Sequence, residues 1–283
     1  MKLVRFGPRS AEKPGIVTAD GRIKDCSAHV ADYDRAFFLG DGIRKLQSLA
    51  ADEGRLPDAP AGVRIGPPVA RPGNILAIGL NYSDHARETG AAIPAEPIFF
   101  MKATGAYSGP FDPIIIPRGS EKTDWEVELG IVIGRDTRSL ASPAAARDSI
   151  AGYCVANDVS ERAFQLERGG QWSKGKSCDS FLPLGPWLVT ADEVPDPQKL
   201  GLTLDVNGRR RQTGSTATMI FDVFFLIHYL SQFLTLQAGD VLITGTPPGV
   251  GMGCKPPEFL RAGDVVTLAI DGLGSQRSVC ENA

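Results

Sequence analysis

The sequence predicts an α+β fold that is mostly β, with a mixed and largely antiparallel sheet. Short apolar segments separated by glycine and proline turns occupy most of the chain, and predicted helices are few. Strands and helices do not alternate regularly, as they would in a Rossmann-like sheet. Neither a G-x-G-x-x-G motif nor a P-loop occurs. The predicted strands span residues 75–79, 98–101, 125–133, 153–157, 187–190, 202–206, 241–244, 265–270 and 276–280.

The beginning of the chain has the pattern of a small separate module. Residues 15–25 read as a strand, a tight turn at Asp20-Gly21, and a second strand. A helix is predicted over residues 39–53. Several prolines then interrupt the chain, which is typical of a boundary. We therefore predict a small β-rich N-terminal domain at residues 1–70 and a larger domain at residues 71–283.

The larger domain contains few predicted helices. Asn207-Gly208 is a strong signal for a hairpin turn between two strands. The apolar stretch 219–236 contains Asp222 and His228, so we predict a buried helix there and not a membrane span. The predicted helices span residues 83–89, 142–150 with Ser142 as cap, 160–168 ended by Gly169-Gly170, and 218–236.

Composition excludes several classes of partner. The 283 residues include 30 basic and 33 acidic residues, for a net charge of −3. This balance offers no electrostatic footprint for nucleic acid or an anionic membrane, and we expect the single dense basic run, residues 209–211, to be a solvated hairpin arm. The five cysteines form no C-x-x-C pair, so neither a disulfide framework nor a zinc cluster is indicated. With no signal-peptide pattern at the start, we expect a cytoplasmic protein.

The segment Asp124 to Ile133 carries the first chemical signal. Side chains alternate faces along a strand, so Glu126 and Glu128 should point the same way while the apolar residues between them face a core. Such alternation also occurs on an ordinary solvated sheet face. A third carboxylate, Asp158, follows the next apolar strand, where it could equally cap a helix. Three carboxylates without a His/Cys cluster suit a hard cation such as Mg²⁺ or Mn²⁺.

Two further segments carry candidate catalytic groups. If residues 83–89 are helical, His85 and Glu88 share a face at i, i+3, and a carboxylate beside a histidine can make it a general base. The alternative is an exposed helix with an incidental histidine. Lys176 lies in a Gly-Lys-Ser segment and could stabilise a developing negative charge, although surface exposure is the commoner fate of a lysine. The Gly/Pro turn at residues 244–251 could bring backbone N–H groups close to a ligand.

Taken together and in this order, these segments resemble the fumarylacetoacetate hydrolase family. The resemblance extends from about Arg71 to the end of the chain, and five motifs in register make it specific. The motifs are N-Y-x-x-H-x-x-E (Asn81 to Glu88), E-x-E (Glu126 and Glu128), N-D-x-S-x-R-x-x-Q (Asn157 to Gln165), G-K-S (Gly175 to Ser177) and T-G-T-P-x-G-V-G (Thr244 to Gly251).

The resemblance implies a fold, an assembly and a set of roles. It implies a mixed β-roll catalytic domain with a small N-terminal domain, in a homodimer or higher homo-oligomer. The short H-x-x-E spacing is similar to that of the acylpyruvate-hydrolase members, so Asp84 is left out of the expected metal ligands. The implied roles are metal ligands at Glu126, Glu128 and Asp158, catalytic groups at His85, Glu88 and Lys176, and substrate contacts at Lys102, Arg162, Gln165 and Thr246.

The implied activity is Mg²⁺-dependent hydrolysis of the C3–C4 bond of a 2,4-diketo acid, with Mn²⁺ as the alternative metal. The first seven residues and Glu12 to Gly15 are similar to a bacterial subgroup that acts on 2,4-diketo-3-deoxy sugar acids. Its implied substrate is 2,4-diketo-3-deoxy-L-rhamnonate, giving pyruvate and L-lactate in L-rhamnose catabolism. Alternatives on the same metal site are a 2,4-diketo-3-deoxy-L-fuconate hydrolase, another acylpyruvate hydrolase, an oxaloacetate decarboxylase, an isomerase and a ureidoglycolate lyase.

Overall fold

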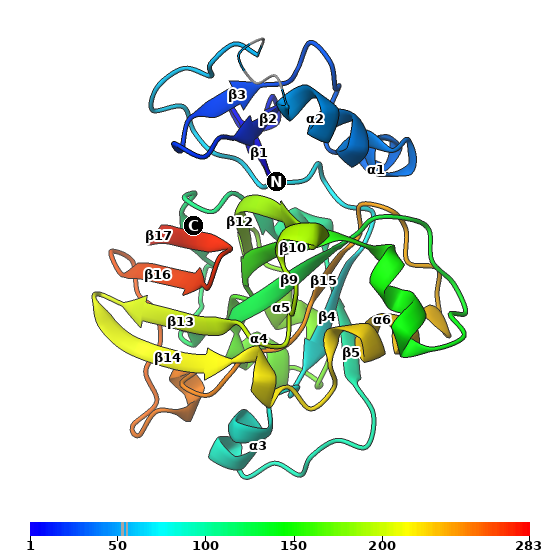
Figure 1. The fold of residues 1–283 in the computed structure, drawn as a ribbon. Helices are drawn as coiled ribbons and strands as arrows, with labels where there is room; N and C mark the ends of the chain where they lie inside the picture. Colours follow the sequence, from blue (N-terminus) through cyan, green and yellow to red (C-terminus); the bar gives the residue numbers. More distant parts are fainter. Residues whose placement is uncertain (52–53, 55) are drawn as a thin grey trace.

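The computed structural model describes residues 1–51, 54 and 56–283 and is mostly β, as predicted. A ten-stranded mixed sheet runs through the molecule, with only its β15–β4 and β12–β6 pairs parallel among the strands described (Figure 1). In spatial order its strands are β3 (Ile23–Asp25), β2 (Lys13–Val17), β1 (Lys2–Phe6), β12 (Leu182–Thr190), β10 (Ile150–Asn157), β9 (Val127–Ile133), β15 (Val241–Ile243), β4 (Ile75–Gly79) and β5 (Ile98–Lys102), with β6 (Tyr107–Ser108) on β12.

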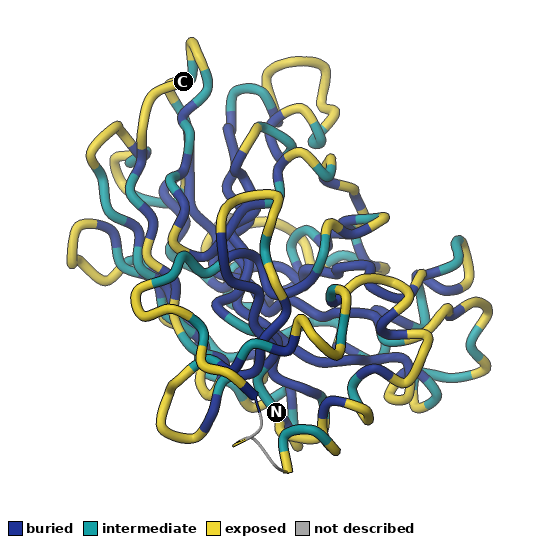
Figure 2. Tube along the Cα trace, turned by 90° about the horizontal axis from the view of Figure 1, so that it is seen from above, coloured by how far each residue is buried: buried dark blue, intermediate teal, exposed yellow. Residues whose placement is uncertain are grey.

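A second sheet packs against the centre of the first and helps to bury both faces of its central strands. Its strands contact β9, β10 and β12, and every residue of β9 and β10 is buried. Figure 2 shows the buried residues concentrated in the middle of the molecule and the exposed residues in the peripheral loops. The second sheet contains β14 (Arg209–Ser215), β13 (Gly201–Val206), β16 (Val265–Ile270), β17 (Gly274–Asn282) and β7 (Ile114–Ile116), and a separate pair is formed by β11 (Ser160–Glu161) and β8 (Thr123–Asp124).

Helices lie at the periphery of the sheets, and α3 and α6 are the clearest examples in Figure 1. No helix in the part of the chain described is both long and apolar enough to cross a membrane. The α-helices are α1 (Arg35–Leu39), α2 (Gly42–Ala50), α3 (Ser83–Thr89), α4 (Arg162–Leu166), α5 (Ser173–Lys176) and α6 (Val223–Ser231), and the 3₁₀ helices are η2 (Thr104–Ala106), η3 (Pro143–Ser149), η4 (Ala191–Glu193), η5 (Thr216–Thr218) and η6 (Gly251–Gly253).

All nine strands predicted after residue 70 are present, but three of the four helices predicted there are not as expected. The helix at 83–89 is confirmed. The one at 142–150 is instead the 3₁₀ helix η3, which ends at Ser149 because β10 begins at Ile150. The Ser142 side chain forms no cap hydrogen bond. The one at 160–168 begins only at Arg162, because Ser160 pairs with Asp124 across β11 and β8.

The helix predicted at 218–236 is also too long. Its α-helical part is α6, and it begins where the Asp222 side chain accepts the N–H groups of Phe224 and Phe225. Residues 216–218 form a separate 3₁₀ turn. Asp222 therefore caps the helix and does not lie inside it, which is the usual place for an aspartate. Burial of the helix is partial, since only one side of α6 is buried.

The Asn-Gly hairpin and the basic run that follows it are only partly as predicted. Asn207 and Gly208 have φ angles of 53° and 75°, which a tight hairpin turn between β13 and β14 requires. Arg209 and Arg210 are exposed on the arm. Arg211 departs from the prediction, because it is half-buried and both of its terminal nitrogens donate to the Glu258 carboxylate.

The N-terminal segment is continuous with the large sheet. The predicted hairpin is confirmed as β2 and β3, and β1 pairs antiparallel with β12. The predicted helix at 39–53 is wrong at its start, because Gly40 ends α1 and α2 begins at Gly42 after the left-handed Asp41. The final residues of that prediction lie outside the described part of the chain. The domain boundary at residue 70 stays a prediction.

Candidate active site

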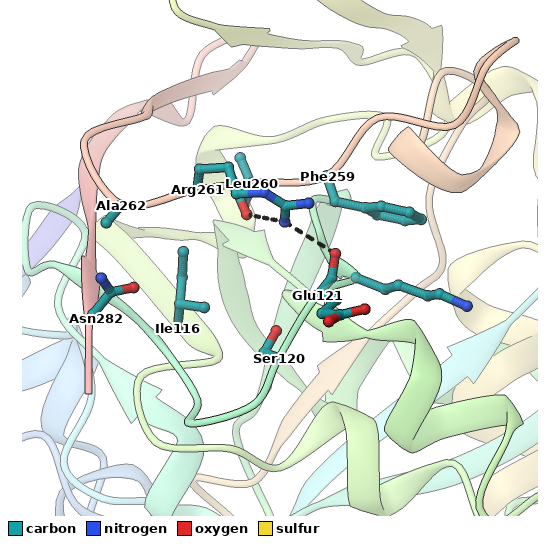
Figure 3. Close-up of a pocket in the computed structure, with 9 residues that line it drawn as sticks. Ile116, Ser120, Glu121, Phe259, Leu260, Arg261, Ala262 and Asn282 are labelled. Atoms are coloured by element: carbon teal, nitrogen blue, oxygen red, sulfur yellow. Dashed lines mark hydrogen bonds between the residues drawn. The ribbon is translucent and has the colours of Figure 1, made fainter.

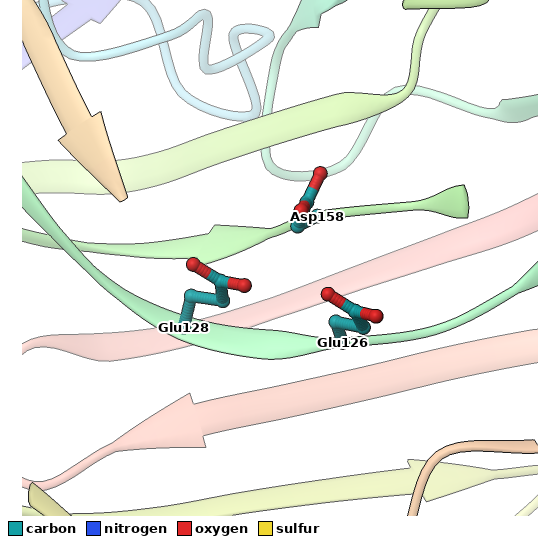
Figure 4. Close-up of side chains that lie close together, drawn as sticks. All are labelled: Glu126, Glu128 and Asp158. Atoms are coloured by element: carbon teal, nitrogen blue, oxygen red, sulfur yellow. The ribbon is translucent and has the colours of Figure 1, made fainter. Parts of the chain in front are cut away.

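Three carboxylates meet in the middle of the large sheet. β9 and β10 pair antiparallel with Val127 opposite Asn157, and the N–H of Asp158 donates to the main-chain oxygen of Glu126 at 2.9 Å. This register places Asp158 beside the E-x-E segment, and Glu126 and Glu128 point to the same side as predicted (Figure 4). One carboxylate oxygen from each of the three residues lies within 4.8 Å of the others. All three side chains are buried, so the segment is not a solvated sheet face.

Two buried lysines neutralise part of this negative charge. Lys176 Nζ lies 2.8 Å from Glu126 Oε2 and 2.5 Å from Asp158 Oδ2. Lys102 Nζ donates to the Asp158 carboxylate and, at 3.3 Å, to the Val159 carbonyl. Burial lowers the pKa of Lys102 more than Asp158 raises it. Burial also acts to lower the pKa of Lys176, but Asp158 and Glu126 together raise it above the usual value.

A fourth carboxylate, Asp124, joins the cluster through an arginine. Arg162 Nη2 lies 2.7 Å from Glu126 Oε1 and 2.8 Å from Asp124 Oδ2. The Asp124 carboxylate also accepts the N–H groups of Gly251 at 2.6 Å and Met252 at 3.0 Å. Asp124 is fully buried, and it therefore ties Arg162 to the loop that follows the Gly/Pro turn.

We expect Asp124→Asn to destabilise the protein strongly. The substitution leaves Arg162 buried with only one of its two carboxylate partners, and breaking a buried ion pair costs about 3–5 kcal/mol. Urea unfolding of the variant and the wild type measures the change. The control is Asp205→Asn, which breaks the exposed pair with Arg210 and should cost no more than about 1 kcal/mol. Equal losses in the two variants would contradict the role given to Asp124.

Glu128 differs from the other carboxylates because no basic side chain in the described part of the chain forms an ion pair with it. Its carboxylate accepts the N–H of Gly245 at 2.7 Å. Burial, followed by repulsion from Asp158 and Glu126, raises the pKa of Glu128 well above its ordinary value. A hard cation would compensate this charge, since three carboxylate oxygens are the donors that Mg²⁺ and Mn²⁺ prefer. The residues present therefore fit a divalent metal ion.

The predicted histidine–glutamate pair is formed on α3. His85 Nδ1 lies 3.0 Å from Glu88 Oε2, as the i, i+3 spacing requires. Glu88 is held in turn by Gly249, whose N–H lies 3.1 and 3.2 Å from the two carboxylate oxygens. A carboxylate at Nδ1 orients the imidazole ring and raises the basicity of its other nitrogen, Nε2.

Gly249 is also held by Trp125, the residue before Glu126 in the chain. The indole Nε1 of Trp125 donates to the Gly249 carbonyl at 3.0 Å. Gly249 has a φ of +102°, and a Cβ there would come within 2.0 Å of the Arg211 carbonyl, so only glycine fits. The Gly/Pro turn thus brings a backbone N–H to Glu88, while its predicted approach to a ligand stays a prediction.

His85, Glu126 and Glu128 line one cavity of about 250 Å³. Arg162, Gln165, Lys176 and Thr246 line it too. Asp158 and Lys102, which form an ion pair with each other, are not among its lining residues. Its lining consists of Ile78, Gly79, Leu80, His85, Ile98, Phe100, Glu126, Glu128, Arg162, Gln165, Leu166, Trp172, Lys176, Gly245, Thr246 and Met252.

A second hollow of about 470 Å³ lies elsewhere, beneath residues 259–262 (Figure 3). In it Arg261 Nη1 donates to the carbonyl oxygens of Glu121 and Leu260 at 3.0 and 3.1 Å. Its lining residues, all within the described ranges, include no histidine and no group of converging carboxylates. The cavity of about 250 Å³ is the candidate active site because it contains His85 and two of the three clustered carboxylates.

The remaining predicted residues also lie in or beside the cavity. Gln165 accepts a hydrogen bond from Arg162 Nη1 at 3.1 Å. Thr246 donates to the Val127 carbonyl at 2.9 Å and accepts from Gln212 Nε2 at 2.8 Å. Asp84, left out of the expected ligands, instead accepts a hydrogen bond from Thr218 at 3.2 Å. The roles of these side chains toward a substrate stay predictions.

Sequence reasoning missed three residues that build the site. Asp124 lies two residues before Glu126, just as Glu126 lies two residues before Glu128. The alternation of side chains along a strand therefore predicts all three carboxylates on one face. Gln212 crosslinks β9 to Thr246 from the basic hairpin arm. Trp172 packs edge-to-face on Phe100, with ring centroids 5.4 Å apart. No motif marks Gln212 or Trp172.

A mostly β fold gathers three carboxylates, two lysines, an arginine and a His–Glu pair in and next to one cavity. This arrangement defines the class: an enzyme whose site could hold a hard divalent cation. The family model described as fumarylacetoacetate (FAA) hydrolase, C-terminal, matches residues 74–280. The chain belongs to the fumarylacetoacetate hydrolase family.

Similar proteins agree with this membership. A Burkholderia ambifaria protein, whose name assigns it provisionally to the hydrolases, is 56% identical over 284 residues that cover 100% of both chains. The fumarylacetoacetate hydrolase of Exiguobacterium antarcticum has a TM-score of 0.86 at 34% identity and 100% coverage of both chains. The maleylpyruvate hydrolase of Sphingobium sp. SYK-6, solved with manganese(II) and pyruvate, has a TM-score of 0.83 at 31% identity and 100% coverage of both chains.

Isomerases share the fold as well. The 2-hydroxyhepta-2,4-diene-1,7-dioate isomerase of Mycobacterium marinum has a TM-score of 0.77 at 31% identity, covering 100% of this chain and 98% of that one. The family expectation made from the motifs is therefore confirmed, and so is the mixed, mostly β fold. The family contains both hydrolases and isomerases, so the reaction has to be argued from the site.

Proposed function

We propose that this chain is a divalent-metal-dependent hydrolase that cleaves the C3–C4 bond of a 2,4-diketo acid and releases pyruvate. The observation that carries the proposal is the His85–Glu88 pair, whose histidine lines the cavity together with Glu126 and Glu128. An isomerase or an oxaloacetate decarboxylase needs no group to activate water, whereas a hydrolase does. The maleylpyruvate hydrolase solved with manganese(II) and pyruvate supports this choice.

Glu126, Glu128 and Asp158 would hold the metal ion, with Mg²⁺ as the proposed metal and Mn²⁺ as the alternative. When bound, such an ion supplies Lewis acidity toward the oxygen atoms of the substrate. Lys176 and Arg162 then place positive charge at the same end of the cavity. We assign the carboxylate end of the diketo acid to this region, with Gln165 and Thr246 as neutral hydrogen-bonding partners.

His85 and Glu88 activate the water molecule that attacks the substrate. Glu88 keeps the Nδ1 side of the ring engaged, so Nε2 takes a proton from water as the water oxygen bonds to C4. The C3–C4 bond then breaks, its electron pair stays on C3, and the proton held on Nε2 is available to convert C3 into the methyl group of pyruvate. The other product is the carboxylic acid made from C4. Lys176 stabilises the negative charge that develops during these steps.

The physiological substrate we propose is 2,4-diketo-3-deoxy-L-rhamnonate, which would give pyruvate and L-lactate in the breakdown of L-rhamnose. This step rests on the similarity of the N-terminal stretch to the sugar-acid subgroup. 2,4-Diketo-3-deoxy-L-fuconate and other acylpyruvates are the neighbouring candidates. We also propose a cytoplasmic homodimer, as the family resemblance implies.

Pyruvate release from 2,4-diketo-3-deoxy-L-rhamnonate tests the proposal. We expect turnover with Mg²⁺, its loss when EDTA is added, and its return with excess Mg²⁺, because the triad holds the ion. Oxaloacetate is the matched control, and a coupled lactate dehydrogenase assay reports pyruvate from both. Rapid loss of oxaloacetate without turnover of the diketo acid would replace the hydrolase by a decarboxylase.

A further inference from the structure

The active-site cavity has an apolar wall beside its charged end. Ile98 pairs with Gly79 across β5 and β4. The Trp172 ring lies so close to Gly79 that a Cβ there would be 2.5 Å from Cζ3. Trp172 in turn packs against Phe100. Gly79, Ile98, Phe100 and Trp172 therefore form one continuous surface, the aromatic wall, which offers almost no hydrogen-bonding group.

The rim of the cavity is apolar as well. Leu166 at the end of α4 is 45% exposed and Met252 is 37% exposed, and both line the cavity. Exposed large apolar side chains at a pocket mouth indicate a ligand that is itself apolar there. A substrate that enters the cavity past this rim therefore contacts the apolar side chains of Leu166 and Met252.

Each cation that lines the cavity is already engaged at the metal-site end. Arg162 contacts Asp124 and Glu126, and Lys176 contacts Glu126 and Asp158. Apart from these two, the cavity-lining set within the described residues contains no lysine or arginine. One carboxylate of a substrate can be matched at that end, but a second one, at the far end, would have no cation to pair with.

We propose that the aromatic wall and the apolar rim select diketo acids whose C4 substituent is short and uncharged, and reject those ending in a second carboxylate. This inference rests on the proposed function and names its substrate class. A buried carboxylate without a partner is strongly disfavoured. The cavity of about 250 Å³ is also below the usual range for larger ligands. The maleylpyruvate hydrolase and the heptadiene-dioate isomerase are named for dicarboxylates, so this chain would differ from both in substrate class.

A matched pair of substrates tests the inference. 2,4-Dioxoheptanoate and 2,4-dioxoheptanedioate have the same carbon chain, and only the diacid carries a carboxylate at C7. With Mg²⁺ present, we expect kcat/KM for the neutral-ended acid to exceed that for the diacid by about 100-fold or more, the scale of an unpaired buried charge. Equal rates, or a preference for the diacid, would overturn the inference.

A variant on the rim sharpens the test. Leu166→Arg adds a cation at an exposed position on the cavity mouth, so the ratio of the two kcat/KM values should fall by up to about fivefold, the scale of a single exposed ion pair of up to about 1 kcal/mol. Leu166→Gln is the control, because it adds polarity without charge and should leave the ratio near that of the wild type. If Leu166→Arg leaves the ratio unchanged, the rim does not select against charge and this part of the inference is wrong.

The experiment separates failure of the inference from failure of the proposed function. If neither of these acids nor 2,4-diketo-3-deoxy-L-rhamnonate releases pyruvate, the hydrolase proposal is wrong. The selectivity of the cavity is then measured by calorimetric binding of the same two acids with Mg²⁺ present. Tighter binding of the neutral-ended acid would support the inference, and equal or tighter binding of the diacid would overturn it.

Discussion

Replacing Glu128 by glutamine should abolish metal-dependent turnover and also make the metal-free protein more stable. Glu128 is buried, and its pKa is raised first by burial and then by Asp158 and Glu126. At neutral pH its ionised form therefore costs folding free energy, and this cost grows as the pH rises above the ordinary value of a glutamate. Glutamine removes the charge but keeps an oxygen to accept the Gly245 N–H.

The same substitution should remove the stabilisation that a metal ion gives. An ion at 100 times its Kd raises the free energy of unfolding by about 2.7 kcal/mol, which corresponds to several degrees in Tm for a chain of this size. Thermal unfolding with EDTA and with Mg²⁺ measures both effects. We expect Glu128→Gln to unfold above the wild type in EDTA and to gain little from Mg²⁺.

Glu126→Gln is the matched control, because it changes the neighbouring carboxylate by the same atoms and should have the opposite sign. Although burial acts to raise the pKa of Glu126, Lys176 and Arg162 lower it to about 2. Its charge therefore stabilises the fold above the pKa of an ordinary glutamate, and this stability is lost as the pH falls toward 2. Removing one partner of these buried cations should cost about 3–5 kcal/mol in EDTA. If both variants lose stability equally in EDTA, Glu128 is not the uncompensated charge of the cluster.

The contrast between these glutamates marks how far the sequence could predict the site. Alternation along a strand was enough to place Glu126 and Glu128 on one side, and helical spacing was enough to pair His85 with Glu88. The motifs in order also indicated the family and hence the mixed β fold. These predictions depend on short-range geometry, which a local pattern contains.

What the sequence did not show depends on residues far apart in the chain. Glu126 meets Arg162 and Lys176, which are 36 and 50 residues away, while Glu128 meets neither in an ion pair. Lys102 forms an ion pair with Asp158 and does not line the cavity. Its place in β5, two residues after Phe100, had put it on the same side of the strand as residues that do line the cavity. The early start of β10 at Ile150 likewise displaced a predicted helix. Tertiary pairing decided each of these cases.

Replacing His85 by alanine should reduce kcat for the diketo acid by about 10²–10⁴-fold, the usual contribution of a positioned general base. The affinity for Mg²⁺ should stay close to that of the wild type, because the candidate metal ligands are Glu126, Glu128 and Asp158 and do not include His85. Steady-state pyruvate release gives kcat, and the Mg²⁺-induced shift in Tm reports metal binding separately. An unchanged kcat would remove His85 from the mechanism and favour a reaction that needs no activated water.

Glu88→Gln tests whether the pair acts as a unit. Glutamine can still accept the Gly249 N–H that holds residue 88 in place, but it carries no charge to stabilise a protonated imidazole. We therefore expect both Glu88→Gln and His85→Ala to lower kcat and to change its dependence on pH, with the larger loss in His85→Ala. If His85 only shapes the cavity wall, both variants would change KM and leave the pH profile of kcat intact. The profile of kcat thus distinguishes proton transfer at Nε2 from packing, because only a titrating base makes turnover follow its own protonation.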